Sequence, residues 1–391
     1  MRPSAEWIRE HRLASAALAV AILLAFASII EGVHNALQFS TDFQWSPVSL
    51  LVHGENPYQV ALSGNVDGKI LLSQYPPYLH LLYIVMAPFA FLPYGAAKLV
   101  WALINIALGA GSLALLARIF RLAPLQILIL AAAFFISTPF RNGLGNGQTS
   151  LLCLFAALAW WDWQDRRKIA AAGALSLLLV KYSFAPPIVF WLLATARLRL
   201  LAASLLCLAA GWLGFSWICH ENPLDTLGQP MKVAALYAES LGGGDIMTLL
   251  KSSGLDRPVA GFVHLSWIVG ILTSCLWVGA LRWRAARLSQ AALLAALCLI
   301  AMVSIRHLAY DYVFLAPAAA LAFSLPRRWG AAMALLVAYF WFGLKLLDLM
   351  GVNDGRMEAI SFVALNAMLL IALLAPAAPS IDRAKGEPWP A

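Results

Sequence analysis

The chain has 391 residues, of which 62% are hydrophobic and only 12% are charged, and its formal net charge is +8. Soluble domains usually carry about 25% charged residues, so this composition excludes an ordinary soluble protein. The Lys and Arg residues lie in short clusters beside apolar segments, which indicates membrane topology and excludes a nucleic-acid-binding surface.

Long apolar stretches recur from Leu13 to the C-terminus. Their length of roughly 17–25 residues is that of an α-helix crossing the hydrocarbon core of a bilayer. They do not alternate strictly between apolar and polar residues, which excludes a transmembrane β-barrel, so we predict an all-α polytopic membrane protein. The first span, at 13–36, is preceded by three arginines and is too long for a cleaved signal peptide. We therefore expect an uncleaved anchor with a cytoplasmic N-terminus.

Residues 38–93 are expected to form an outer loop that contains juxtamembrane helices. The polar stretch 38–74 must lie outside if the N-terminus lies inside. The segment 75–93 contains four prolines, each of which removes a backbone donor or kinks a helix, so we predict a broken helix along the outer interface. Without a crossing in this segment, the later clusters of Arg and Lys all face the cytoplasm.

The rest of the chain is predicted to complete a single membrane domain with about twelve crossings. Central spans occupy 95–219, an outer loop follows at 220–261, C-terminal spans occupy 262–376, and 377–391 form a cytoplasmic tail. The segment 169–196 is interpreted as a tight hairpin of two short crossings, because only then do the basic clusters on both sides of it face the cytoplasm. The crossings after the first are expected at 95–117, 123–139, 148–163, 169–181, 184–196, 200–219, 262–282, 288–305, 309–325, 329–349 and 358–376.

Asp42 stands in the first outer loop, just beyond the first span. A carboxylate at this place can act as a general base on an acceptor hydroxyl within hydrogen-bond reach. The alternative is structural, because Asp is a favoured N-cap and a helix is expected to begin near Trp45. Spacing alone does not separate these two interpretations.

Further polar residues are expected on the same outer side. Gln148 enters a span after a glycine-rich turn whose spacing is not that of a dinucleotide site. Lys181 interrupts an apolar run, where its ammonium group could neutralise a phosphate or extend to the interface. Arg306 and His307 could bind an anionic phosphate, and Asp311 could orient His307. An ion pair between Arg306 and Asp311 is the structural alternative.

The five cysteines lie inside or beside apolar spans and show no paired spacing. We therefore expect neither a disulfide nor a metal site from them.

Short motifs follow one another in a fixed order between about Thr41 and Tyr312. They are Asp42-Phe43, Gly54-Glu55-Asn56-Pro57-Tyr58, Tyr75-Pro76-Pro77-Tyr78, Leu92-Pro93 with Trp101, Asn146-Gly147-Gln148, Leu179-Val180-Lys181-Tyr182 and His307-Leu308-Ala309-Tyr310-Asp311-Tyr312. This series resembles glycosyltransferase family 87, whose members are membrane enzymes of the GT-C fold. One departure is the loop 242–248, which differs from the Gly-Asn-x-Ser type expected nearby.

The resemblance implies inverting transfer of a sugar, such as mannose, another hexose or arabinose, from a polyprenyl-phosphate donor. The acceptor is a lipid or glycan at the outer face of the cytoplasmic membrane, and no metal or other cofactor is implied. Asp42 matches the general base, His307 the histidine near the donor phosphate, and Lys181 the family's lysine. Four more residues are predicted to bind the donor phosphate or the substrate: Arg306, which rests on chemistry alone, and Gln148, Asp311 and Tyr58.

Two other functions would use an outer polar site. A transporter or flippase often has internal repeats and charges near the bilayer midplane. We find no repeat, and the charges cluster toward the outer end. A ligase that joins a finished glycan to a lipid would need an undecaprenyl-diphosphate donor.

Overall fold

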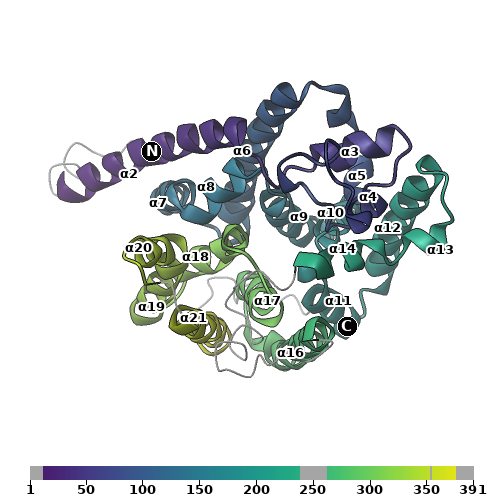
Figure 1. The fold of residues 1–391 in the computed structure, drawn as a ribbon. Helices are drawn as coiled ribbons and strands as arrows, with labels where there is room; N and C mark the ends of the chain where they lie inside the picture. Colours follow the sequence, from purple (N-terminus) through teal and green to yellow (C-terminus); the bar gives the residue numbers. More distant parts are fainter. Residues whose placement is uncertain (1–11, 238–261, 353–354, 376–391) are drawn as a thin grey trace.

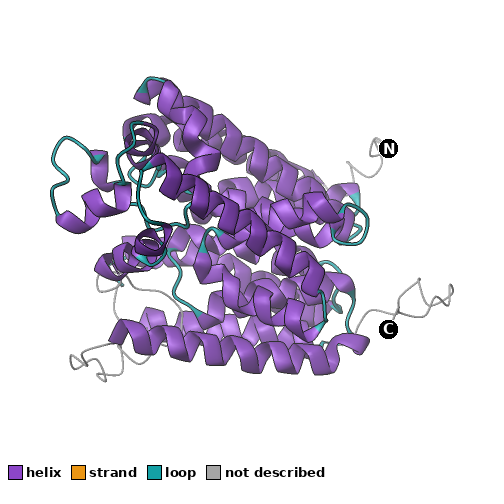
Figure 2. Ribbon diagram, turned by 90° about the vertical axis from the view of Figure 1, so that its right-hand side faces the viewer, coloured by secondary structure: helices purple, strands orange, loops and turns teal. Residues whose placement is uncertain are grey.

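The computed structural model describes residues 12–237, 262–352 and 355–375. All regular structure in these ranges is helical, which confirms the predicted all-α class (Figures 1 and 2). The predicted tail 377–391 and the loop 242–248 lie outside the described residues.

The helices vary widely in length, and several are broken by short 3-10 or π turns. The α-helices are α2 (Arg12–Gln38), α3 (Trp45–Val52), α4 (Pro57–Ser63), α5 (Leu81–Met86), α6 (Tyr94–Ile119), α7 (Pro124–Ile136), α8 (Thr138–Gly145), α9 (Ser150–Trp163), α10 (Lys168–Leu179), α11 (Ala185–Ala194), α12 (Leu198–Ile218), α13 (Pro223–Thr226), α14 (Gln229–Tyr237), α16 (Phe262–Arg284), α17 (Gln290–Ser304), α18 (Ala316–Ala322), α19 (Arg327–Ala338), α20 (Leu344–Leu349) and α21 (Gly355–Leu374). The shorter turns are η1 (Leu71–Ser73), η2 (Ala87–Phe91), η3 (Tyr182–Phe184), η5 (Ala285–Arg287), η6 (Ala309–Leu315) and η7 (Tyr339–Gly343).

Six helical segments in the described part of the chain are long and apolar enough to cross a membrane. The pairs α7–α8 and α10–α11 are bent by 53° and 108°, and counting each pair as one span gives eight. The protein is therefore a polytopic helical membrane protein, but the prediction of about twelve crossings is not supported. The six segments are Ala14–Gln38, Tyr94–Ile119, Leu198–Ile218, Trp267–Arg287, Arg327–Leu349 and Met357–Leu374.

The predicted number of crossings is too high because several short helices are as apolar as the helices that can span a membrane. The helices α9, α10, α11 and α17 have 14, 12, 10 and 15 residues. At a rise of 1.5 Å per residue they are about 15–23 Å long, whereas the hydrocarbon core is about 30 Å thick. In α9 and α17 most side chains are buried by neighbouring helices. Composition alone does not distinguish a helix buried in protein from one that faces lipid.

The segment 75–93 contains the short helix α5 and the 3-10 turn η2. The apolar stretch Leu81–Phe91 that they form is not among the candidate spans. It packs against α3 and α12, and Figure 1 shows α3, α4 and α5 gathered beside α12 and α14. Residues 38–93, for which we keep the name first outer loop that the sequence analysis gave them as an expectation, thus form a small helical layer of their own.

Basic residues meet at one end of the helix bundle. Arg118 pairs with Asp162, which joins the ends of α6 and α9. Arg197, at the start of α12, has its Nη1 atom 3.0 Å from Asp165 Oδ1, just after the end of α9, and Arg282 Nε donates to the Ala194 carbonyl at 3.2 Å. The first outer loop lies at the opposite ends of α6 and α9.

The first outer loop is hydrogen-bonded to the glycine-rich turn between α8 and α9. Asp42 N donates to the Asn146 carbonyl at 3.0 Å, and from helix α6 the Trp101 Nε1 atom donates to the Gly147 carbonyl of the same turn at 2.8 Å. Gly147 has φ +70°, and a Cβ added to it would lie 2.6 Å from Phe43 Cβ. Only glycine combines this left-handed conformation with so close an approach.

We expect Gly147→Ala to lower the free energy of unfolding by about 3 kcal/mol, because left-handed strain and a steric clash act together. Gly64→Ala is the matched control. Gly64 has φ +73° but no atom within 4 Å of an added Cβ. This control should cost only about 1 kcal/mol. Denaturant unfolding of both purified variants in detergent measures the difference, and equal losses would contradict the clash.

Candidate active site

Asp42 lies in the turn between α2 and α3 and does not cap a helix. The N-cap of α3 is Gln44, without a side-chain cap bond. Gln44 Nε2 instead donates to the Asp42 carbonyl at 2.9 Å. The carboxylate of Asp42 is half-buried. The structure therefore removes the N-cap alternative and leaves the carboxylate for another role.

Burial raises the pKa of Asp42 above its usual value of 3.8. A hydrogen bond from the Gln148 side chain and the positive charge of Lys181 act in the opposite direction, and the negative charge of Asp311 adds to the rise. The pKa is raised overall, so this carboxylate takes up a proton more readily than an Asp in water. The same interactions place Gln148, Lys181 and Asp311 near Asp42.

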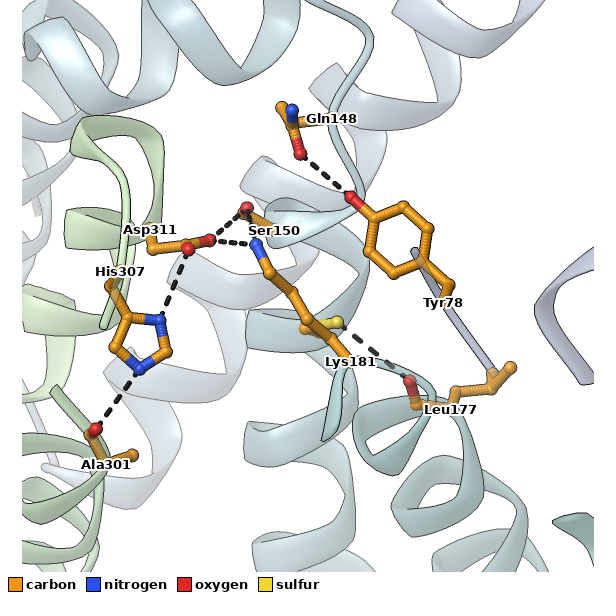
Figure 3. A network of polar contacts seen from close by, with 9 residues as sticks. Tyr78, Gln148, Ser150, Leu177, Lys181, Ala301, His307 and Asp311 are labelled. Carbon is orange, nitrogen blue, oxygen red and sulfur yellow. Dashed lines mark hydrogen bonds and ion pairs between the residues drawn. The ribbon is translucent and has the colours of Figure 1, made fainter. Parts of the chain in front are cut away.

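A buried polar cluster joins three segments that are far apart in the sequence (Figure 3). Lys181 lies at the break between α10 and η3, Asp311 lies in η6, and Ser150 begins α9. Lys181 Nζ pairs with Asp311 Oδ1 and donates to Ser150 Oγ at 3.2 Å, and Ser150 Oγ donates to Asp311 Oδ1 at 2.5 Å. The side chains of Lys181 and Asp311 are 13% and 3% exposed.

His307 adds an imidazole ring to this cluster. Its Nδ1 lies 3.3 Å from Asp311 Oδ2, and its Nε2 lies 3.1 Å from the Ala301 carbonyl. The ring stacks on Phe184, with centroids 4.5 Å apart. Asp311 thus contacts His307 in the manner expected of an orienting carboxylate. Arg306 is half-buried immediately before His307 in the chain.

The sequence-predicted residues Gln148 and Tyr58 have different surroundings. Gln148 is almost fully buried, and its Oε1 accepts a hydrogen bond from Tyr78 Oη at 3.1 Å. Tyr58 is fully buried, and its hydroxyl donates to the Tyr78 carbonyl at 2.6 Å. The structure therefore places Gln148 beside Asp42 and uses the Tyr58 hydroxyl in the packing of the first outer loop.

Three residues of this region were not singled out as site residues from the sequence: Tyr78, Ser150 and Gln74. Tyr78 stands in a Tyr-Pro-Pro-Tyr motif of a kind common at membrane interfaces, and Ser150 gives no signal at the start of an apolar run. Gln74 Nε2 donates to the Ser40 carbonyl at 3.2 Å and to Tyr94 Oη at 2.8 Å, which ties the first outer loop to α6. Only their positions in the fold reveal these roles.

Within 12–237, 262–352 and 355–375, no group of three or more His, Cys, Asp or Glu residues could hold a metal ion. The cluster of Lys181, Asp311 and His307 is instead suited to an anion, because two of its three ionisable groups can carry positive charge.

Comparisons with known proteins identify the family of the chain. No curated protein and no solved structure matches the chain. The sequence profile of glycosyltransferase family 87 matches residues 74–308, which is more than half of the chain and includes Gln148, Ser150, Lys181 and His307. The chain therefore belongs to glycosyltransferase family 87 and is a membrane glycosyltransferase.

Proposed function

We propose that this enzyme has the GT-C fold and transfers a sugar, with inversion, from a polyprenyl-phosphate donor to a lipid or glycan acceptor. The sugar is mannose, another hexose or arabinose. The observation that carries the proposal is the placement of a half-buried carboxylate, Asp42, beside a buried cluster that contains Lys181 and His307.

In this proposal Asp42 is the general base. An acceptor hydroxyl within hydrogen-bond reach gives its proton to the carboxylate as its oxygen attacks the anomeric carbon of the sugar. A bond forms between that oxygen and the anomeric carbon, and the bond from this carbon to the phosphate oxygen breaks on the opposite face. The configuration is therefore inverted, and the electron pair leaves with the phosphate.

The cluster around Lys181 stabilises the leaving phosphate. Departure adds negative charge to the phosphate, and positioned cations lower the energy of that charge in a site with little water. Lys181 and Arg306 supply positive charge here, and the two ring nitrogens of His307 lie beside the Asp311 carboxylate and the Ala301 carbonyl.

The charge distribution supports an active site on the outer side of the cytoplasmic membrane. Positive charge is enriched on the cytoplasmic side of membrane proteins. The basic end of the bundle, with Arg118, Arg197 and Arg282, is opposite the first outer loop. Lys181 lies at the tip of two helices that are each too short to cross alone. Irregular backbone at such depth is tolerated where it is shielded by protein or lines a polar path, which suits a lipid-linked donor.

Asp42→Asn should reduce sugar transfer by about 10²–10⁴-fold, because the amide does not accept the proton of the acceptor. Asp67→Asn, in the exposed part of the same loop, is the matched control and should keep full activity. Purified protein is incubated with synthetic polyprenyl-phosphate mannose or arabinose and membrane extract, and products are identified by mass spectrometry. Substantial turnover by Asp42→Asn would rule out the assigned base, and flipping of the lipid without transfer would favour a transporter.

Asp311→Asn should lower the free energy of unfolding by about 3–5 kcal/mol, because it leaves the buried ammonium of Lys181 uncompensated. The exposed pair of Lys345 and Asp348 is the control, and Asp348→Asn should cost about 1 kcal/mol or less. The double variant Lys181→Met/Asp311→Leu removes both charges and should recover most of the stability while transfer stays absent. Denaturant unfolding and the transfer assay measure the two effects. Recovery of both stability and activity would show that the pair has only a structural role.

A further inference from the structure

Trp101 lies near the start of α6, and its indole ring contacts both backbone segments that meet at Asp42. Its Nε1 donates to the Gly147 carbonyl at 2.8 Å. An indole N–H can only donate and a carbonyl can only accept, so the direction of this bond is fixed. The same ring is stacked on Phe43, with the centroids 6.0 Å apart and the ring planes 13° from parallel. Trp101 is 4% exposed, and Phe43 is fully buried.

The two segments are also joined to each other at this place. The N–H of Asp42 donates to the Asn146 carbonyl at 3.0 Å. Gly147 lies so close to Phe43 that a Cβ added to the glycine would lie 2.6 Å from Phe43 Cβ. Trp101 therefore bridges the two residues, Phe43 and Gly147, that directly follow the bonded pair of Asp42 and Asn146.

A third aromatic ring restrains Phe43 from another side. Phe89 of η2 meets Phe43 edge to face with centroids 5.8 Å apart, and it meets Trp101 in the same way at 5.6 Å. Edge-to-face and stacked aromatic pairs attract each other beyond the effect of surface burial. The carbonyl of Asp42 also has a partner, since Gln44 Nε2 donates to it at 2.9 Å. Both backbone groups of Asp42 are therefore bonded, and its neighbour Phe43 is held between two rings.

From these contacts we infer that Trp101 is a positioning residue for the general base. It joins Phe43 to the turn that binds the backbone of Asp42, and so holds the carboxylate at the place where the acceptor hydroxyl is deprotonated. A displacement of about 1 Å can cost about 10²-fold in rate, because proton transfer requires hydrogen-bond reach. The inference rests on the proposed role of Asp42, and it gives a role to the tryptophan that follows the Leu92-Pro93 motif.

The first test measures hydrogen exchange of the Asp42 amide in purified protein without substrate. Trp101→Phe removes the indole N–H and keeps a ring beside Phe43. Exchange at Asp42 should become about fivefold faster, the factor expected for one hydrogen bond, while exchange in α9 and α17 stays unchanged. A general loss of packing would instead accelerate exchange in all three places.

Two further variants complete this test. Phe43→Leu removes the other ring of the stack and should accelerate exchange of the Asp42 amide about two- to tenfold, so the contact is tested even if the indole is required for folding. Trp212→Phe is the matched control, because it also removes an indole N–H that donates to a backbone carbonyl, that of Pro223 at 3.0 Å. It should leave the exchange of the Asp42 amide unchanged.

The second test measures transfer from synthetic polyprenyl-phosphate mannose or arabinose. Trp101→Phe should lower kcat about tenfold and leave KM for the donor within about twofold, because the base moves while the phosphate-binding cluster keeps its contacts. The double variant Asp42→Asn/Trp101→Phe should be as slow as Asp42→Asn alone, since a base that is absent cannot be misplaced. Trp212→Phe should keep full activity.

The inference would be overturned by an unchanged Asp42 amide in both Trp101→Phe and Phe43→Leu, by equal acceleration in α9 and α17 or in Trp212→Phe, or by additive losses of rate in the double variant. The proposed function is judged separately. Absence of transfer from polyprenyl-phosphate sugars, or full activity of Asp42→Asn, would overturn the proposed function, while the exchange measurement without substrate still shows whether Trp101 holds the backbone of Asp42.

Discussion

The ion pair between Lys181 and Asp311 is the interaction on which the rest of the site depends. Its two side chains are 13% and 3% exposed, and removal of two charges from water costs several kcal/mol per ion unless further hydrogen bonds compensate. Ser150 and His307 supply these bonds. The pair therefore holds together the start of α9, the break between α10 and η3, and η6, and none of these segments contains the site by itself.

The breaks in the helices allow the charged side chains of this ion pair to meet. In a continuous helix, the backbone groups around Lys181 would hydrogen-bond to one another and the side chain would project from the side of the helix. The 108° bend between α10 and α11 instead places Lys181 at the end of both helices. His307 and Asp311 lie in a comparable break between α17 and α18. Short helices that end within the bilayer leave polar backbone behind, and such backbone is stable only where protein surrounds it. The structure thus concentrates its irregular backbone around one polar cluster.

Features that depend on local sequence patterns could be predicted, whereas features that depend on packing between distant segments could not. The all-α class, the short helices within 38–93 and the family all follow from apolar runs, prolines and motif order, and the family profile confirms the last. The number of crossings could not be predicted, because α9 and α17 are apolar for contact with protein rather than with lipid. Spacing also left Asp42 undecided between cap and base, and only the observed N-cap at Gln44 removes one alternative. Ser150 carried no signal, since its partners Lys181 and Asp311 are distant in sequence.

The two halves of the proposed chemistry are coupled through one short segment. Tyr78 is hydrogen-bonded to Gln148, which follows the turn that binds the backbone of Asp42, and the next residue, Leu79, is hydrogen-bonded to Val180, which precedes Lys181. Base and phosphate-binding cation are thus positioned from adjacent residues of a segment that the prolines stiffen before α5. Inverting transfer requires the attacking and leaving oxygens to stand on opposite faces of one carbon. A rigid link between the groups that serve these oxygens fixes their separation before substrate arrives, so less of the binding energy is needed to arrange them.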